Sequence, residues 1–223
     1  SDVPNGGFFG QNDDTISSYF FDEDTSGKTG GTSTADMKTL STFTDAGWDF
    51  TNTWILDASV NNGYPTFSFA PHVPIALVPS GSGILSDPYL IANLGNLIWV
   101  SQNSASWDAK YFKQMADIDA VFSKNLDIGQ GLTPIGTDSF TPFKGYYDGN
   151  GKTISNAYIN RTATYIGIFG YVSGDAEIKN LNIEDANITG ITTNQSFNGL
   201  GVLVGTAGDN GQTIVFKDIN ISG

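Results

Sequence analysis

The stretch AEIKNLNIEDANITG, residues 176–190, decides how this chain folds. Apolar residues alternate in it with Asn, Asp, Glu and Thr, and the stretch ends at a glycine. This pattern predicts a β-strand region with one buried face and one exposed face. The stretches KTISNAYINRTATYIG (152–167) and QTIVFKDINISG (212–223) repeat it, so the chain contains several equivalent strands.

The repeats predict coils that stack on one another. Ile154, Ile178 and Ile214 lead three comparable strands, and glycine-bounded strands in 165–175 and 199–211 lie between them. Repeats of about 20 to 40 residues made of short strands and turns are typical of β-solenoids, whose coils stack about 4.8 Å apart. We therefore expect an all-β solenoid with the three isoleucines in one interior column.

The corners between strands are expected to use residues that accept left-handed backbone angles. Glycine adopts such angles at no steric cost, and Asn tolerates them while hydrogen-bonding its own turn. Asn156 and Asn180 each stand two residues after a leading isoleucine, so we expect them at matching corners.

Composition narrows the functional classes. The net charge of −13 and the lack of a Lys/Arg-rich run argue against a nucleic-acid partner, because the phosphate backbone attracts clustered positive charge. The chain has no cysteine and therefore no disulfide or thiolate metal site. No signal peptide is visible, and the longest apolar run, 73–79, is too short to span a membrane. We expect a processed chain or an excerpt of a longer one.

Three regions are predicted along the chain. Residues 71–83 are rich in proline, serine and glycine and are expected to form a linker. Residues 1–70 before it form a small β-rich segment, with strands expected near 15–27 and 48–57 and a strand after an Asn-Gly turn at 62–63. Between the first two strands, Ser33 or Thr34 is expected to cap a short helical turn. Residues 84–223 form the solenoid.

The solenoid itself divides into a cap, 84–112, and coils, 113–223. Within the cap, residues 93–104 have helical spacing. The first coil of a solenoid exposes an open apolar end that another element must cover. We expect this helix to cover it with Leu94, Leu97 and Ile98.

The glycine-bounded strands resemble the GLUG-motif repeats of bacterial surface and secreted proteins. GVLVG at 201–205 and GIFG at 167–170 fit the motif, and the region from Gly81 to Asn160 resembles the entry into such an array. Residues 15–67 resemble the closing piece that follows an array. The resemblance implies a right-handed parallel β-helix in a large, adhesin-like protein at the cell surface or outside the cell. It implies no particular activity.

Residues that could perform catalysis are few. The single histidine, His72, lies in the predicted linker without a motif that positions a nucleophile, so no catalytic residue is predicted. Asp117 and Asp119 would share one face of a strand and, with Asp148, could form the carboxylate set of a glycan-cleaving site. The competing interpretation places Asp117 and Asp119 outward at the end of a strand and Asp148 in a turn.

Two further groups could bind ligands. Asp22, Glu23 and Asp24 are the candidate ligands for a structural Ca²⁺, although such runs are more often solvated charge. No other cofactor is expected. The four tryptophans could stack on sugars or could pack in the core and cap, which we favour; they are Trp48, Trp54, Trp99 and Trp107.

These observations predict a non-enzymatic, extracellular module that forms a stiff rod. The expected partners are other copies or modules of the same protein, through head-to-tail joining, or a glycan or surface of a host or the environment. No nucleic-acid partner and no membrane span are expected. The alternative is a polysaccharide-binding or polysaccharide-cleaving β-helix protein, which would gather acids and aromatics on one sheet face.

Overall fold

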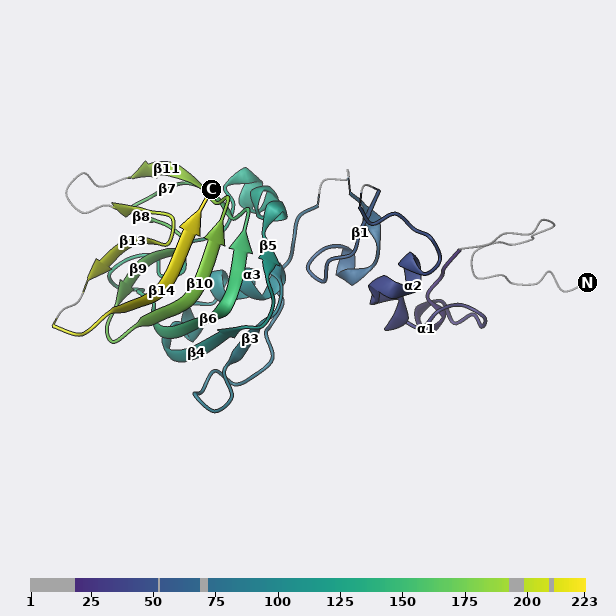
Figure 1. The fold of residues 1–223 in the computed structure, drawn as a ribbon, viewed down its shortest axis with the longest axis horizontal. Coiled ribbons are helices and arrows are strands. Elements are labelled where there is room, and N and C mark those ends of the chain that lie inside the picture. The colour runs from purple at the N-terminus through teal and green to yellow at the C-terminus, as the bar shows by residue number, and fades with distance from the viewer. Residues whose placement is uncertain (1–18, 52, 69–71, 193–198, 209–210) are drawn as a thin grey trace, which may run out of the picture. The chain divides into compact units, whose positions relative to one another are not determined.

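The computed structural model describes residues 19–51, 53–68, 72–192, 199–208 and 211–223. The chain forms two compact units, Ser1–Pro71 and His72–Gly223, which are described separately (Figure 1). β-Structure with parallel sheets predominates in the described residues. None of their helices is long and apolar enough to cross a lipid bilayer.

The first unit combines short helices with one small antiparallel sheet. The strand expected near 15–27 is wrong for the described residues 19–27, and residues 15–18 lie outside the described part. The carboxylate of Asp22 caps a helix here instead, and Gly27, at a φ of 67°, ends it. The elements are α1 (Glu23–Ser26), η1 (Asp36–Lys38), α2 (Leu40–Thr44), β1 (Trp54–Ile55), η2 (Asn61–Gly63) and β2 (Thr66–Phe67).

Two local predictions for this unit are confirmed. The hydroxyl of Ser33 accepts a hydrogen bond from the backbone N–H of Asp36, the first residue of the short helical turn η1, at 3.1 Å, although the residue directly before η1 is Ala35. Asn62 and Gly63 both adopt left-handed angles in the turn that joins β1 to β2. The core of the unit forms around the fully buried Phe43.

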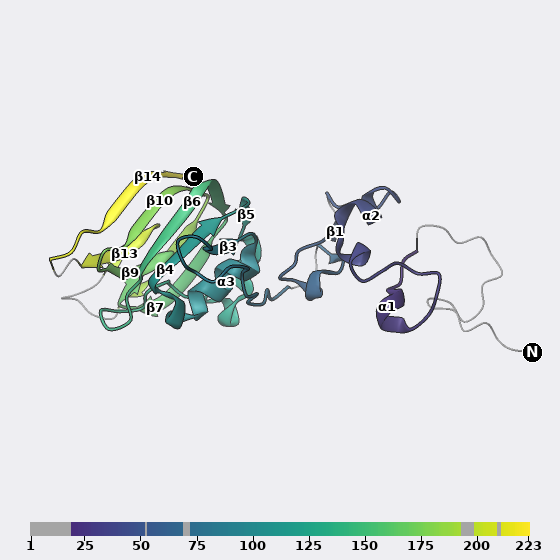
Figure 2. The same cartoon turned by 90° about the horizontal axis from the view of Figure 1, so that it is seen from below.

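One parallel sheet dominates the second unit. Its strand order is β14-β10-β6-β4-β3, and β5 (Ile118–Asp119) also pairs with β6. Figures 1 and 2 show β6, β10 and β14 side by side in this order. The strands are β3 (Tyr89–Ile91), β4 (Asp108–Gln114), β6 (Lys144–Ser155), β10 (Glu177–Glu184) and β14 (Val215–Ser222).

The other strands of this unit pair in the same chain order. After β6 the chain forms β7, β8 and β9, and after β10 it forms β11, β12 and β13, each parallel to its counterpart. The segment from β10 to β13 therefore lies against the segment from β6 to β9, strand by strand. The strands are β7 (Tyr158–Ala163), β8 (Tyr165–Ile166), β9 (Phe169–Ser173), β11 (Asn187–Thr192), β12 (Gly199–Leu200) and β13 (Val204–Gly208), and the short helices are η3 (Ser104–Ser106), η4 (Val121–Asn125) and η5 (Asp127–Gly129).

The predicted register of the repeats is wrong. Ile154 pairs with Ile183, not Ile178, and Ile183 pairs with Ile221. Ile178 instead stands between Tyr147 and Phe216. The three isoleucines share a Thr-Ile or Glu-Ile opening, but this opening stands at different positions in the paired strands, and Ile214 lies just before β14.

The physical reason for the error is a left-handed residue inside the long strands. Asn150, Asn180 and Asp218 have φ values of 54°, 52° and 52°, and the register between β10 and β6 shifts next to Asn180. Asn156, which was matched to Asn180, lies at a later corner. It follows Ser155, the partner of Glu184, and its N–H donates to the carbonyl of Glu184 at 3.0 Å.

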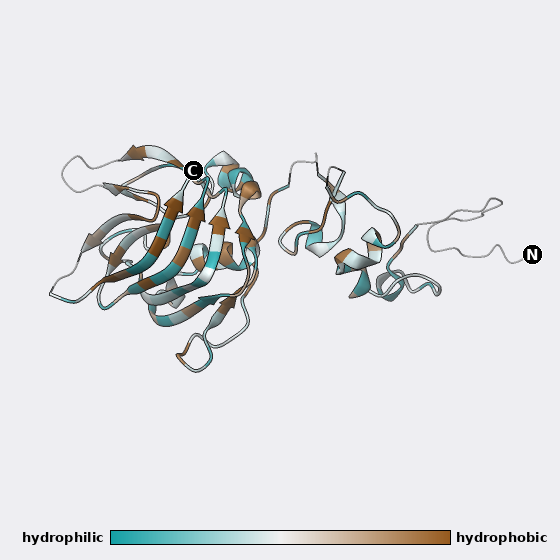
Figure 3. Cartoon of the chain, viewed as in Figure 1, coloured by the Kyte–Doolittle hydropathy of each residue, from teal (hydrophilic) through white to brown (hydrophobic). Residues whose placement is uncertain are grey.

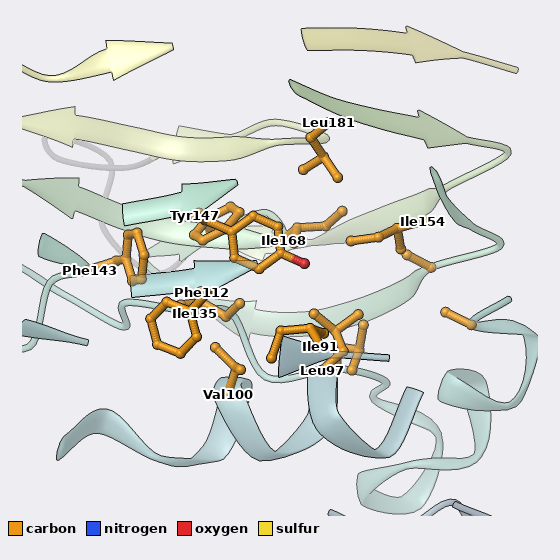
Figure 4. Close-up of a cluster of buried hydrophobic side chains, with 14 of the residues drawn as sticks. Ile91, Leu97, Val100, Phe112, Ile135, Phe143, Tyr147, Ile154, Ile168 and Leu181 are labelled. Atoms are coloured by element: carbon orange, nitrogen blue, oxygen red, sulfur yellow. The ribbon is translucent and has the colours of Figure 1, made fainter. Parts of the chain in front are cut away.

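The core lies between the sheets and the helix α3 (Leu94–Gln102). Polar and apolar residues alternate along β6, β10 and β14 (Figure 3), and the inward side chains pack into one cluster (Figure 4). The predicted helix is confirmed: the Asn93 side chain accepts from the N–H of Asn96 at its start. Leu94, Leu97 and Ile98 are each 1% exposed and contribute to the cluster.

Part of the predicted linker packs onto this unit. The N–H of Leu77 donates to the carbonyl of Gly95 at 2.9 Å, and the side chain of Asn96 donates to the carbonyl of Leu77 at 2.9 Å. His72 is also buried. This part of the predicted linker is therefore attached to the second unit at His72 and Leu77.

Small residues allow three backbone segments to stack at one corner. The N–H of Gly170 donates to the carbonyl of Ile135, and the N–H of Phe169 donates to the carbonyl of Leu203, both at 2.8 Å. A Cβ on Gly170 would lie 2.4 Å from the carbonyl oxygen of Gly136. Glycine is needed here because the neighbouring backbone occupies the place of a side chain.

The column of Ile118, Ile154, Ile183 and Ile221 provides a matched test of the packing. We expect Ile154→Ala to lower the free energy of unfolding by about 2–5 kcal/mol, because Ile154 is 1% exposed and its removal leaves a cavity. Ile221→Ala should cost much less, because Ile221 is 49% exposed. Urea denaturation followed by far-UV circular dichroism measures both. Equal losses would contradict this packing.

Candidate functional site

A groove of about 270 Å³ on the outer face of the main sheet is the candidate site. Its floor is formed by residues that alternate with the buried inward residues Phe112 and Tyr147. The first row across the strands consists of Tyr111, Tyr146 and Glu177, which are register partners on β4, β6 and β10. The strand register thus brings together side chains that are far apart in the sequence.

The second row of the floor is charged. Lys113, Asp148 and Lys179 are register partners on the same three strands. Lys179 forms an ion pair with Glu177 at 3.0 Å, whereas Lys113 forms no ion pair with a described residue. The groove therefore contains two positive and two negative charges and is neutral overall.

Two tyrosine rings stack in the groove. The ring centroids of Tyr111 and Tyr146 are 4.4 Å apart, with an angle of 11° between the planes. Burial, followed by the neighbouring Tyr111 and the charges of Asp175 and Glu177, raises the pKa of Tyr146 above its ordinary value. The Tyr146 hydroxyl therefore keeps its proton at neutral pH and can donate a hydrogen bond.

An apolar loop forms one wall of the groove. Leu85 and Pro88 line it, and the side chain of Leu85 is 74% exposed. The loop is fixed by hydrogen bonds between the backbones of Ile84 and Asp87. The N–H of Tyr111 also donates to the carbonyl of Gly83 at 3.1 Å, so the loop is attached to the strand that carries the tyrosine.

Of the three aspartates considered for glycan cleavage, only Asp148 lines the groove. Its Oδ1 accepts from the N–H of Asn150 at 2.8 Å and from the side-chain amide of Asn180 at 2.9 Å. Asp117 accepts from the N–H of Thr153 at 2.9 Å, and Asp119 accepts from the N–H of Val121 at 3.0 Å. All three carboxylates stabilise local backbone structure, and the structure does not gather them into one site.

His72 has a packing role in the second unit. Its ring lies edge-on to Phe122, with ring centroids 5.2 Å apart, and its carbonyl accepts from the side chain of Asn125. It is 7% exposed. These contacts join the start of the unit to the short helix η4.

The candidate Ca²⁺ ligands accept hydrogen bonds within the first unit. Asp22 accepts from the hydroxyls of Thr34 and Tyr64, Asp24 accepts from the N–H of Thr34, and Glu23 accepts from the N–H of Gly31. These bonds join α1 to the following loop. The described residues contain no cluster of three or more acidic or histidine side chains suited to a metal ion.

The tryptophans divide between the two units. Trp107 is 3% exposed, and its ring N–H donates to the carbonyl of Val100 at 2.7 Å, which joins β4 to α3. Trp99 packs edge-on against Tyr89. In the first unit Trp54 stacks between Trp48 and Phe67, with centroids 4.3 Å apart on each side. None of the four lines the groove, whose aromatic residues are tyrosines and a phenylalanine.

Sequence reasoning missed the groove because its residues come from strands whose register was misaligned. Tyr111 and Tyr146 each precede an inward aromatic residue, Phe112 and Tyr147, in the parallel segments KYFK and GYYD. The similarity between KYFK and GYYD indicates the correct alignment of β4 with β6.

The last strand of the sheet, β14, pairs with only one described strand, β10. Its residues Phe216 and Ile221 are 42% and 49% exposed, although their register partners Ile178 and Ile183 are fully buried. Among the described residues, β14 therefore has one edge without a strand partner beside partly exposed apolar side chains.

The stability of the first unit should depend on pH through Asp22. Its hydrogen bond from Tyr64 holds the carboxyl pKa at about 2, below the ordinary value of 3.8. Because the pKa is lowered by folding, the stabilisation is present at neutral pH and is lost as the pH falls from about 4 towards 2. We expect the amide NMR signal of Thr25, whose N–H donates to Asp22, to weaken over this range.

Asp22→Asn should remove this dependence and should destabilise the unit already at neutral pH. Asp45→Asn, which changes an exposed carboxylate at the end of α2, is the matched control. An unchanged pH profile in the Asp22 variant would contradict the assignment.

Comparison with known proteins gives partial similarities. No model of a known protein family matches the chain. It is 34% identical over 141 residues to Halomucin of Haloquadratum walsbyi, which covers 60% of this chain and 1% of that protein. It is 35% identical over 111 residues to a protein of Evansella cellulosilytica named as a Gly-rich membrane protein, which covers 49% of this chain and 12% of the other.

Among solved structures, a Bacteroides ovatus protein described as an immunoglobulin A1 protease matches 57% of this chain and 33% of its own. The sequence identity is 21% and the TM-score is 0.42. The chain thus spans only a small part of the curated relatives it matches, and it is similar to segments of much longer proteins.

Proposed function

We propose that the chain is a structural, non-enzymatic module of a large cell-surface or secreted protein of bacterial type. In this proposal the second unit is a right-handed parallel β-helix of the GLUG-motif kind, and it forms part of a stiff rod. Surface exposure suits the net charge of −13, which keeps an extended protein soluble. The small share of each relative that the chain spans, 1% and 12%, supports a modular place in a long protein.

The observation that carries this proposal is the strand-by-strand pairing of successive passages of the chain. β6 to β9 pair in parallel with β10 to β13, and β14 continues the main sheet. Hydrogen bonds between parallel strands then run along one axis, and each layer buries its apolar residues against the next. Such an arrangement resists bending without needing a ligand or a catalytic group.

The absence of cysteine from the chain allows a direct test of the stacking. Asn182 and Asn220 are outward-facing register partners on β10 and β14. Paired strands lie about 4.8 Å apart, which suits a disulfide. We expect Asn182→Cys with Asn220→Cys to form one on mild oxidation, detected by non-reducing electrophoresis and peptide mass spectrometry.

A matched pair shifted along the strand provides the control. Glu184→Cys with Asn220→Cys places the two sulfurs out of register, beyond the roughly 7 Å limit between Cα atoms for a disulfide. Bridging of the shifted pair, or none in the matched pair, would refute the stacked arrangement.

We further propose that modules join head to tail. The acceptor in this proposal is the edge of β14 that has no partner among the described strands, with its half-exposed apolar residues. The donor is the first unit, residues 1–70, of another copy. Coverage of β14 by a second chain would bury Phe216 and Ile221 as Ile178 and Ile183 are buried within the chain.

Cross-linking of mixed ¹⁴N- and ¹⁵N-labelled protein tests this joining. An amine-reactive cross-linker should link Lys28 or Lys38 to Lys217 of a differently labelled copy, and sedimentation velocity should show association that grows with concentration. Phe216→Lys should abolish both results because a charge would be buried at the contact. Phe140→Lys, which changes a 96% exposed residue elsewhere, should not. A monomer at every concentration would rule out the joining.

A further inference from the structure

We propose that the outer-face groove binds a neutral carbohydrate and holds one sugar ring of a glycan. This activity goes beyond the proposed scaffold role and does not depend on it. The groove of about 270 Å³ lies slightly below the roughly 300–1,000 Å³ of sites for drug-sized ligands, so it suits one ring better than an enclosed oligosaccharide.

The walls of the groove match the two sides of a sugar. A sugar ring has apolar C–H faces and a rim of hydroxyl groups, so it needs apolar or aromatic surface beside polar groups. Tyr111 and Tyr146 provide aromatic surface, and Leu85 and Pro88 provide an apolar wall. These four side chains line the groove and leave it open to a ligand.

The floor supplies both hydrogen-bond donors and acceptors. The ammonium group of Lys113 has no hydrogen-bond or ion-pair partner among the described residues, and Oδ2 of Asp148 accepts no hydrogen bond from them. A hydroxyl group both donates and accepts, so one sugar hydroxyl can bridge these two neighbours in the register. Ion pairing between Lys179 and Glu177 fixes the far side of the floor.

The charges favour a neutral ligand over an ionic one. Two lysines and two carboxylates line the groove, so neither an anion nor a cation gains from the net charge of the site. The chain as a whole carries −13, which repels acidic polysaccharides. A neutral glycan loses nothing to this repulsion and uses both kinds of polar group.

The test is binding of the full chain to a defined panel of probes. The panel contains cellohexaose, laminarihexaose, mannohexaose, xylohexaose and chitohexaose as neutral glycans, with polygalacturonate and heparin as acidic ones and a proline-rich peptide as a competing ligand class. Isothermal titration calorimetry at millimolar ligand gives affinities. ¹H–¹⁵N NMR shifts on the unmodified chain locate the site, and we expect them at Leu85, Tyr111 and Tyr146.

The variants separate the groove from the rest of the surface. Tyr146→Ala should weaken binding of the neutral glycan about tenfold, as expected for loss of an aromatic contact, and Lys113→Gln should weaken it less. Tyr165→Ala is the matched control, because Tyr165 packs on Tyr171 with centroids 4.8 Å apart outside the groove. Its affinity should equal that of the unmodified chain. If Tyr146→Ala does not fold, Tyr146→Phe and the NMR shifts take its place.

Three results would overturn the proposal. The first is the lack of any neutral-glycan binding at millimolar concentration. The second is binding that Tyr146→Ala and Lys113→Gln leave unchanged, or NMR shifts away from the groove. The third is binding of only acidic glycans or only the proline-rich peptide. None of these results would bear on the stacking of the strands, which the disulfide pairs test separately.

Discussion

The structure of the second unit depends on one constraint: the long strands must accommodate a left-handed residue at the same level in successive layers. Asn150, Asn180 and Asp218 fulfil this requirement in β6, β10 and β14. Each interrupts the alternation of its strand, so that in β10 the buried residues Ile178 and Leu181 stand three positions apart instead of two. The pairing of Ile154 with Ile183, beyond this irregularity, follows from it.

The same register produces an inside and an outside with different properties. Inward positions stack Phe112, Tyr147 and Ile178 into a buried column. The adjacent outward positions place tyrosines in one row and charges in the next. Tyr147 brings a polar group into this buried column. Its hydroxyl donates to the side chain of Gln114 at 3.2 Å, and burial raises the pKa of the hydroxyl. A polar group is thus tolerated in the core because it has a partner.

The sequence predicted much of this architecture but not its register. Repeated alternation predicted the strands, and the spacing of Leu94, Leu97 and Ile98 predicted the helix and its buried face. Alignment failed at Ile178, because an Asn inside a strand and an Asn at a corner look alike in sequence. The groove could not be predicted for the same reason: Tyr111, Tyr146 and Glu177 become neighbours only when the strands are correctly paired. In the first unit, Asp22 as a helix cap overrode the alternation expected near 15–27.

The half-exposed final layer has a consequence for how the fold comes apart. Among the described strands, β14 is paired on one side, while β6 and β10 are paired on both. Among the described strands of this sheet, we therefore expect faster amide hydrogen exchange in β14 than in β6 and β10. A molecule bound along this edge of β14 would slow its amide hydrogen exchange and would also protect the strands that pair behind it.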